Sequence, residues 1–520
     1  MDKVILFDTT LRDGAQGAGV SFSVDDKLKI AKALDAFGVH YVEGGWPGSN
    51  PKDELFFKEA AKVKFKNARI TAFSSTRYKG NRAANDPNLK ALVNSKVKTV
   101  CIFGKSWDFH VKNALRTTEE ENLKMIEDSV AFLKSKGLEV IYDAEHFFDG
   151  FKANREYALK TLSAAKAGGA DFAVLCETNG GMLPMDILEI TSVVRNMLPD
   201  IKLGIHAHND SGCAVANSLV AVSAGCTMVQ GTINGLGERC GNANLCSIIP
   251  ALQVKLGLSS VNPKKLESLT ELSRYVDEIA NLVPNDLQPY VGANAFAHKA
   301  GIHVSAIARD SSTYEHMTPE LVGNTRRILI SELSGKSNIS HKARELSLDI
   351  EKDPDAAKKI ISLVKTYEEQ GYQFEDADGS FFLLTRKALG TYKSFFKTKS
   401  YRVSVERDDS GQLVSEATVK LSVKGQEIHT VAEGDGPVNA LDAAIRKALV
   451  RLYPEIKEML LSDFKVRVIN AGASTAAKVR VLIETRDKKS SWGTIGVSEN
   501  IIEATWQALV DAVEYKLMKK

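Results

Sequence analysis

Short apolar runs alternate with amphipathic segments over the first 235 or so residues of the chain. The apolar runs have the length and the β-branched content of strands, and segments such as 23–37, 118–136 and 154–167 repeat apolar positions at helical spacing. This alternation predicts a parallel sheet of βα units, and eight units favour a closed (β/α)₈ barrel. The predicted strands are residues 4–7, 40–43, 70–73, 99–103, 139–142, 172–176, 203–206 and 228–232.

An open, doubly wound sheet is the alternative interpretation of the same pattern. Such a sheet is expected to carry a G-x-G-x-x-G phosphate loop after an early strand, and Gly14-Ala-Gln-Gly17 lacks that spacing. In a barrel, all strand ends open on one face, so polar residues that follow different strands would converge there. Those residues are Asp8, Arg12, Asp13, Glu43, Asp143, Glu145, Glu177, Thr178, His206, His208, Asn209 and Asn234.

The pattern changes twice after residue 250. A mostly helical stretch runs to about residue 390, and two copies of a β-β-β-α pattern follow it. The sequence therefore predicts an α/β chain with a TIM barrel (1–275), helical linker subdomains (276–390) and an α+β domain of two repeats (391–520). The repeats comprise strands near 401–406, 415–423 and 426–432 with a helix at 437–452, then strands near 464–470, 476–485 and 491–497 with a helix at 500–516, with Gly-rich turns at 434–436 and 470–474.

The composition disfavours two classes of partner. The chain has 68 Lys+Arg against 65 Asp+Glu, a net charge of +3, and no long basic block, which disfavours binding to nucleic acid or to an anionic membrane. No apolar stretch approaches the length of a membrane span, and the apolar run at 4–7 is too short for a signal peptide. The six cysteines form no C-x-x-C pair and read as reduced thiols. We therefore expect a cytoplasmic protein.

The segment His206-Ala-His208-Asn-Asp210 is the most informative motif for chemistry. Residues i and i+2 of a strand point to one side, so both imidazoles can reach one metal ion. Two buried core histidines are the alternative, because an H-x-H pair also occurs by chance. A third ligand is needed to complete such a metal site.

Asp13 is the best candidate for that ligand, because it closes the segment Phe7-Asp-Thr-Thr-Leu-Arg-Asp13 after the first predicted strand. Two histidines and one carboxylate leave open positions for substrate and water. The alternative for Arg12 and Asp13 is a surface ion pair that begins a βα loop.

Other polar positions admit two interpretations each. The segment Asn234-Gly-Leu-Gly-Glu-Arg-Cys-Gly-Asn242 allows close backbone approach, or is only a turn before a helix. Glu145 and His146 are either acid–base groups or a solvated strand end. His303 lies in an apolar stretch, where a single histidine is more often a core residue than a catalyst. Composition and spacing predict a metal-dependent barrel enzyme and leave its reaction open.

Four motifs together resemble the family of α-isopropylmalate, homocitrate and citramalate synthases, which condense acetyl-CoA with a 2-oxo acid. They are Asp8-Thr-Thr-Leu-Arg-Asp-Gly14, His206-Ala-His208-Asn-Asp210, Gly237-Glu-Arg-Cys-Gly-Asn-Ala243 and Gly301-Ile-His303. The resemblance covers essentially the whole chain, because that family also has a linker subdomain and a regulatory domain of two β-β-β-α halves.

Further segments resemble the citramalate synthase branch, which uses pyruvate. They are Glu43-Gly-Gly-Trp-Pro-Gly-Ser-Asn-Pro51, Tyr142-Asp-Ala-Glu-His-Phe-Phe-Asp-Gly150, Cys176-Glu-Thr-Asn-Gly-Gly181 and Ser331-Glu-Leu-Ser-Gly-Lys336. The isopropylmalate branch usually has Gln-Asp after the histidine that matches His303, whereas Val304 and Ser305 follow it here.

The resemblance implies a role for each matching residue. Asp13, His206 and His208 would hold a divalent cation (Mn, Mg, Zn or Co), with Asn242 as a further ligand. Arg12 would stabilise an alkoxide, Thr178 would bind the pyruvate carboxylate, and His303 with Glu145 would move the acetyl-CoA proton. Gln16 and Tyr314 would also contact substrate. The product would be (R)-citramalate, and isoleucine would inhibit a homodimer through residues 391–520.

Three other functions compete with this one. The first is 2-isopropylmalate synthase, which prefers 2-oxoisovalerate and belongs to leucine biosynthesis. The second is a lyase or a biotin-dependent carboxyltransferase barrel, since those families carry related versions of the first motif. The third is a metal-dependent amino-acid-binding regulator without catalysis, against which the presence of Arg12, Asp13, His206, His208 and His303 argues.

Overall fold

The structure is a computed structural model that describes residues 3–350, 353, 355–407, 409, 411–469 and 477–519. Its backbone divides into two compact units. The first unit comprises Met1–Phe296 and Met317–Thr325, and the second comprises Ala297–His316 and Arg326–Lys520. The chain therefore crosses between the units at three places, after residues 296, 316 and 325.

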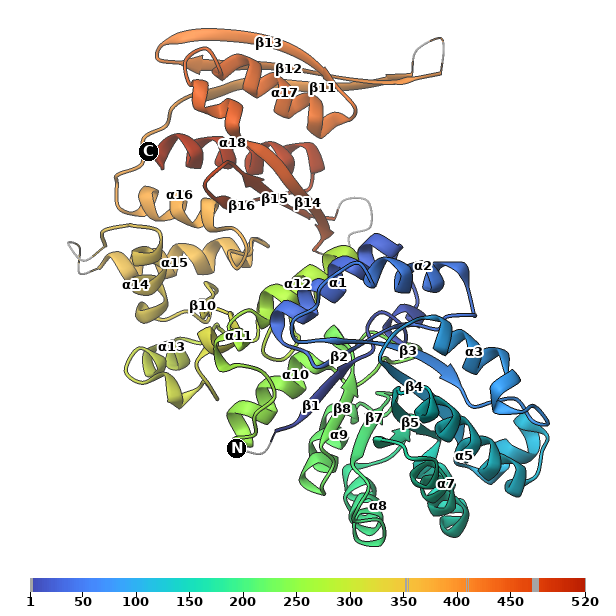
Figure 1. The fold of residues 1–520 in the computed structure, drawn as a ribbon. Coiled ribbons are helices and arrows are strands. Elements are labelled where there is room, and N and C mark those ends of the chain that lie inside the picture. The colour runs from blue at the N-terminus through green and yellow to red at the C-terminus, as the bar shows by residue number, and fades with distance from the viewer. Residues whose placement is uncertain are drawn as a thin grey trace. The chain divides into compact units, whose positions relative to one another are not determined.

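The first unit is a closed barrel of eight parallel strands, as the alternation of runs predicts. Strand β1 pairs with both β2 and β8, and this pairing closes the sheet and excludes the open doubly wound alternative. Figure 1 shows the strands surrounded by helices. The strands are β1 (Ile5–Asp8), β2 (Tyr41–Gly45), β3 (Arg69–Ser75), β4 (Thr99–Lys105), β5 (Glu139–Glu145), β6 (Phe172–Glu177), β7 (Leu203–Ala207) and β8 (Met228–Gly231).

The helices of this unit begin and end at residues with clear local signals. Helix α1 starts after Ser23, whose side chain and that of Asp26 form a capping box, and it ends at Gly38, which has a φ of 105°. The main helices are α1 (Val24–Phe37), α2 (Pro51–Ala60), α3 (Pro87–Asn94), α5 (Glu119–Ser135), α7 (Arg155–Gly168), α8 (Pro184–Met197), α9 (Ala214–Ser223), α10 (Leu245–Pro250) and α12 (Leu269–Ile279), with shorter α4 (Asp108–His110), α6 (Phe147–Ala153) and α11 (Pro263–Leu266).

The barrel strands bury both of their faces, which is why their sequences read as continuous apolar runs. Successive side chains of a strand point to opposite faces, so one set fills the lumen and the other packs under the helices. The lumen cluster comprises Phe7, Tyr41, Phe73, Cys101, Ile141, Phe172, Val174, Cys176 and Met228. The lumen is thus packed, and chemistry is confined to the end of the barrel.

The second unit contains helices and two separate antiparallel sheets. The predicted helical stretch is present, and two short parallel strands that the sequence pattern does not reveal accompany it. These elements are β9 (Ala297–His298), α13 (Gly301–Ile307), β10 (Arg327–Ile328), α14 (Lys336–Glu345), α15 (Ala356–Glu369) and α16 (Asp378–Ala388).

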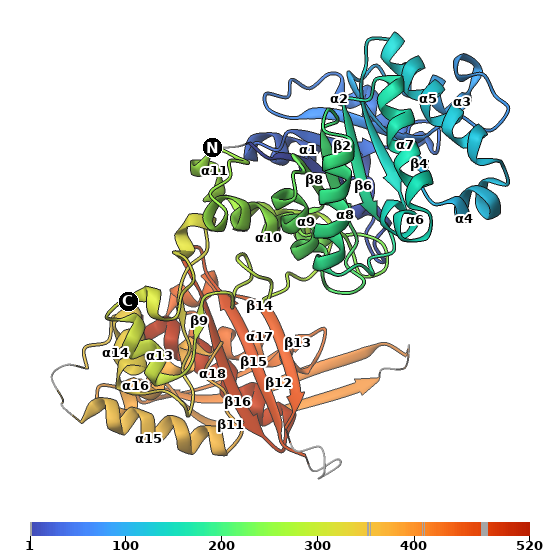
Figure 2. The ribbon, with the colours of Figure 1, turned by 90° about the horizontal axis from the view of Figure 1, so that it is seen from below.

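Both predicted β-β-β-α repeats are confirmed, each with three strands in sequential order (Figure 2). The turn predicted at residues 470–474 and the strand ends predicted at 470 and 476 lie outside the described residues. One hydrophobic cluster extends from Ile330 to Leu517, so the linker helices and both repeats share a core. The repeats are β11 (Lys397–Arg407), β12 (Leu413–Val423), β13 (Gln426–Gly434) and α17 (Pro437–Leu449), then β14 (Leu460–Val468), β15 (Val479–Arg486), β16 (Ser491–Ser498) and α18 (Ile501–Met518).

Across the described residues, no helix combines the length and the apolar character required to traverse a bilayer.

Candidate active site

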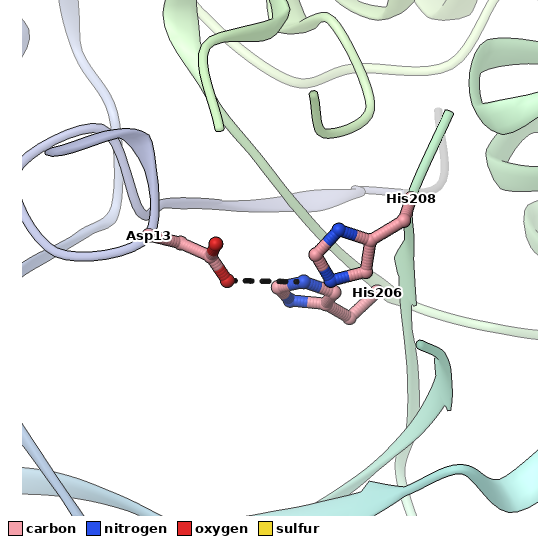
Figure 3. Close-up of side chains that lie close together, drawn as sticks. All are labelled: Asp13, His206 and His208. Atoms are coloured by element: carbon pink, nitrogen blue, oxygen red, sulfur yellow. Dashed lines mark ion pairs between the residues drawn. The ribbon is translucent and has the colours of Figure 1, made fainter. Parts of the chain in front are cut away.

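Asp13, His206 and His208 meet at the carboxyl end of the barrel strands. Their ligand atoms all lie within 4.8 Å of one another, and each residue is at most 6% exposed. Figure 3 shows both imidazole rings facing the Asp13 carboxylate, and Nε2 of His206 lies 3.5 Å from Oδ2 of Asp13. The i, i+2 spacing of the two histidines therefore directs both rings to the same side, as the sequence predicts.

Gln230 of β8 orients the His206 ring. The register of β7 and β8 sets His206 opposite Gln230, whose Oε1 lies 2.7 Å from His206 Nδ1. The Gln230 amide group donates to Asp143 Oδ1 at 2.9 Å, so its carbonyl oxygen faces the histidine and can only accept. Nδ1 of His206 must then carry the proton, and Nε2 keeps a lone pair directed toward Asp13. This is the hydrogen bonding usual for a histidine that binds metal.

The electrostatics of the three side chains also suit a cation. Burial, together with the neighbouring His206, lowers the pKa of His208 to about 3, so its imidazole is neutral and able to act as a ligand. Burial alone would raise the pKa of Asp13, but the nearby Arg12, His206 and His208 outweigh it and lower that pKa to about 2. At this cluster, Asp13 Oδ1, His208 Nδ1 and Asn242 Oδ1 are buried and have no hydrogen-bond partner among the described residues. Unpaired buried polar atoms are costly, and a bound ion would satisfy such atoms.

The segment after β8 carries Asn242 into this cluster. An isolated bridge joins its backbone to that of His208, and its amide donates to Leu236 O at 3.1 Å, which leaves Oδ1 unpaired. A Cβ on Gly237 would lie 2.2 Å from the Asn242 amide nitrogen, and one on Gly241 would lie 2.0 Å from a backbone oxygen. The glycines of the segment thus permit the close approach that brings Asn242 to the site.

Arg12 is fixed beside the cluster by three contacts. Its Nε donates to Glu43 Oε2 at 2.6 Å, its Nη1 donates to Asp13 Oδ2 at 3.0 Å, and its guanidinium lies 3.8 Å from the centroid of the Phe73 ring. Burial raises the pKa of Glu43 to about 7, against the opposing effect of Arg12. Phe73, against which Arg12 packs, belongs to an aromatic cluster with Trp46 and Phe103, and the ring centroids of Phe73 and Phe103 lie 5.5 Å apart in a stacked pair.

Other predicted residues lie at neighbouring strand ends. Glu145 ends β5 and forms an ion pair with Lys105, which is its partner in the register of β4 and β5. Thr178 follows β6, and its hydroxyl oxygen accepts a hydrogen bond from the backbone N–H of His146 at 2.9 Å. Gln16 is exposed and belongs to the short helical turn after Asp13. Their contacts with substrate stay predictions.

His303 and Tyr314 belong to the second unit and not to the barrel. Their rings stack with centroids 4.1 Å apart, and Tyr314 is 46% exposed. His303 is half-buried, so it is not the enclosed core histidine that an apolar stretch usually contains. The roles of both residues also stay predictions.

Comparison with known proteins identifies the family. Three family models match consecutive parts of the chain: HMGL-like over residues 3–276, homocitrate synthase post-HMGL domain-like over 290–372, and LeuA allosteric (dimerisation) domain over 375–517. An (R)-citramalate synthase of Aquifex aeolicus is 55% identical, with 100% of this chain and 98% of that protein aligned. An (R)-citramalate synthase of Geobacter sulfurreducens gives the same three values. The chain belongs to the citramalate synthase family.

This membership confirms the resemblance seen in the motifs. A probable 2-isopropylmalate synthase of Methanopyrus kandleri is 31% identical, with 98% of each chain aligned, and is thus a more distant relative. The competing assignment to that branch is correspondingly disfavoured.

Sequence reasoning missed several residues that shape this site. The sequence assigns no role to Gln230 or Phe73, and it marks Glu43 only as a polar strand end and as the first residue of the segment Glu43–Pro51. The one available signal for Gln230 was a polar residue inside an apolar strand. Its partner depends on the register of β7 and β8, which a single sequence does not reveal.

Proposed function

We propose that this protein is a citramalate synthase that condenses acetyl-CoA with pyruvate and hydrolyses the thioester, giving (R)-citramalate and CoA. The observation that carries the proposal is the buried cluster of Asp13, His206 and His208 beside Arg12, in a chain of this family. Asn242, with its unpaired oxygen, adds a fourth ligand. A divalent ion bound by these residues supplies Lewis-acid polarisation of the pyruvate ketone.

The residues around the cluster perform the remaining tasks. Arg12 stabilises the alkoxide that forms when the enolate carbon of acetyl-CoA attacks the keto carbon, and Glu43 together with Phe73 keeps its guanidinium in place. Thr178 donates its hydroxyl hydrogen to the pyruvate carboxylate. His303 with Glu145 removes the methyl proton of acetyl-CoA, and Gln16 and Tyr314 contact the substrates.

We further propose that isoleucine binds to residues 391–520 and inhibits the reaction, and that the protein works as a homodimer. The match to an allosteric, dimerisation domain over residues 375–517 supports both ideas. The proposed domain boundaries are 1–275, 276–390 and 391–520. We place the reaction in the cytoplasm, where acetyl-CoA and pyruvate are central metabolites.

The test is release of CoA thiol from acetyl-CoA by metal-reconstituted protein. Pyruvate, 2-oxobutyrate, 2-oxoisovalerate and 2-oxoglutarate are compared, each with and without isoleucine or leucine. Asp13→Ala is the control for contaminating activity, because it removes a proposed metal ligand. Preference for pyruvate with inhibition by isoleucine supports the proposal. Preference for 2-oxoisovalerate with inhibition by leucine moves the chain to the isopropylmalate branch, and absence of thiol release with every acid overturns the proposed activity.

A further inference from the structure

A clamp of hydrogen bonds joins the ends of strands β5 and β6. The backbone N–H of His146, the residue after β5, donates to Thr178 Oγ1 at 2.9 Å. A hydroxyl that accepts from a fixed N–H has its orientation restricted, and its own hydrogen then points to another partner. His146 therefore influences the direction in which the Thr178 hydroxyl donates.

The backbone of His146 is left-handed, with a φ of 56° and a ψ of 32°, and this conformation turns the chain from β5 into helix α6 while the His146 N–H is directed at Thr178. A residue that resists this conformation would have to shift the main chain around position 146, and the N–H would move with it. Few residues other than glycine adopt this conformation; asparagine, aspartate and histidine do so most often, whereas β-branched residues rarely do. The His146 side chain supports it, since Nδ1 lies 3.4 Å from Asp149 Oδ2, which also accepts from the Asn179 amide at 3.0 Å. The ring of His110 packs edge-on against that of His146, with centroids 4.2 Å apart.

Thr178 is also held through its main chain. Its carbonyl oxygen accepts from Arg239 Nη2 at 2.8 Å, and Arg239 in turn donates from Nε and Nη2 to the two oxygens of Asp210 at 2.8 and 3.0 Å. The Thr178 main chain is thus fixed independently of His146. What His146 adds is control over the hydroxyl group.

We infer that His146 is a positioning residue that aims the Thr178 hydroxyl at the carboxylate of the 2-oxo acid. The inference rests on the proposed function, because it takes pyruvate as the substrate and Thr178 as its carboxylate ligand. The clamp consists of the left-handed His146 backbone, the Thr178 hydroxyl, and the link through Asp149 to Asn179. Its effect is on binding of one substrate and not on the chemical step.

The experiment compares two substitutions of His146 in the full-length, metal-loaded protein. His146→Val resists the left-handed conformation because its side chain is β-branched, whereas His146→Asn tolerates that conformation and keeps the N–H direction. We expect His146→Val to raise the KM for pyruvate about tenfold, with kcat and the KM for acetyl-CoA within about twofold of the parent. We expect His146→Asn to recover most of that loss. Lys96→Val is the matched control, since Lys96 is exposed and left-handed, with a φ of 59°, and precedes β4 at the opposite end of the barrel.

The route of the effect is tested with Thr178→Val alone and combined with His146→Val. If the clamp acts through the hydroxyl, the double variant has nearly the KM of Thr178→Val, because the group that His146 orients is already absent. The inference would be overturned if the increases in KM of the two single variants multiplied in the double variant. It would also be overturned if His146→Val left the KM for pyruvate unchanged or lowered only kcat. If Thr178→Val itself leaves the KM for pyruvate unchanged while the protein makes citramalate, the role of Thr178 fails and the inference with it, but the activity stands. Absence of thiol release by the parent protein overturns both.

Discussion

Replacing Gln230 with leucine should weaken metal binding without removing any proposed ligand. The substitution deletes the acceptor for His206 Nδ1–H, at 2.7 Å, and the donor to Asp143 Oδ1, at 2.9 Å. His206 and Asp143 are each only 4% exposed, so water cannot easily replace either hydrogen bond. Removing the outer partner of a ligating histidine typically costs roughly 10–100-fold in metal affinity, which corresponds to about 1.4–2.7 kcal/mol. We expect a loss in this range.

The assay is titration of metal-free protein with Mn²⁺ or Zn²⁺ in competition with a chromophoric chelator. Gln288→Leu is the matched control, because Gln288 is also buried and donates from its amide to Asn234 Oδ1 at 3.1 Å, and Asn234 is not a proposed metal ligand. Both variants should lose some stability to unfolding, and only Gln230→Leu should lose metal affinity. A folded Gln230→Leu protein with the parental Kd would refute the argument that Gln230 orients His206.

Three further predictions follow from contacts in the two units. Arg12→Lys should keep metal affinity yet lower kcat by roughly 10²–10³-fold, because an ammonium cannot reproduce the guanidinium contacts with Glu43; turnover near that of the parent would contradict this. Phe103→Ala should enlarge the space at the aromatic cluster of which Phe103 is a part. The ratio of kcat/KM for 2-oxoisovalerate to kcat/KM for pyruvate should then rise about tenfold in the thiol assay, and an unchanged ratio would show that this cluster does not select the 2-oxo acid. Burial raises the pKa of Asp511 from 3.8 to about 6, so the free energy of unfolding should fall as pH rises from about 4 to 6. Asp511→Asn, which keeps an acceptor for Ser380, should therefore add about 3 kcal/mol at pH 8 and nothing at pH 3 in denaturant titrations, and equal gains at both pH values would refute the cause.

The sequence was sufficient to predict the barrel, because its strands are buried on both faces and their apolar runs stand out against the helices. It was also sufficient to bring together Asp13, His206 and His208, since each follows or lies near the end of a strand and all strand ends share one face. These predictions rest on the local spacing of apolar and polar residues and on the rule that all strand ends of a barrel open on one face. Neither depends on knowing which residues pair across strands.

Contacts that depend on register or on unusual backbone geometry could not be predicted. Gln230 meets His206, and Lys105 meets Glu145, only because of the alignment of neighbouring strands. The left-handed backbone of His146 is an uncommon conformation for any residue other than glycine, and no glycine marks it, so the clamp on Thr178 has no signature in the sequence. Such departures from local preference are most common where function requires them.

The segment Ala297–His316 leaves the barrel unit and returns to it, yet it belongs to the same compact body as the two β-β-β-α repeats. His303 and Tyr314 therefore belong to the unit that contains the proposed isoleucine sensor, whereas Arg12 and the three proposed ligands belong to the barrel unit. A rigid rotation of the second unit would carry the side chains of His303 and Tyr314 with it and would leave the three proposed ligands of the barrel undisturbed.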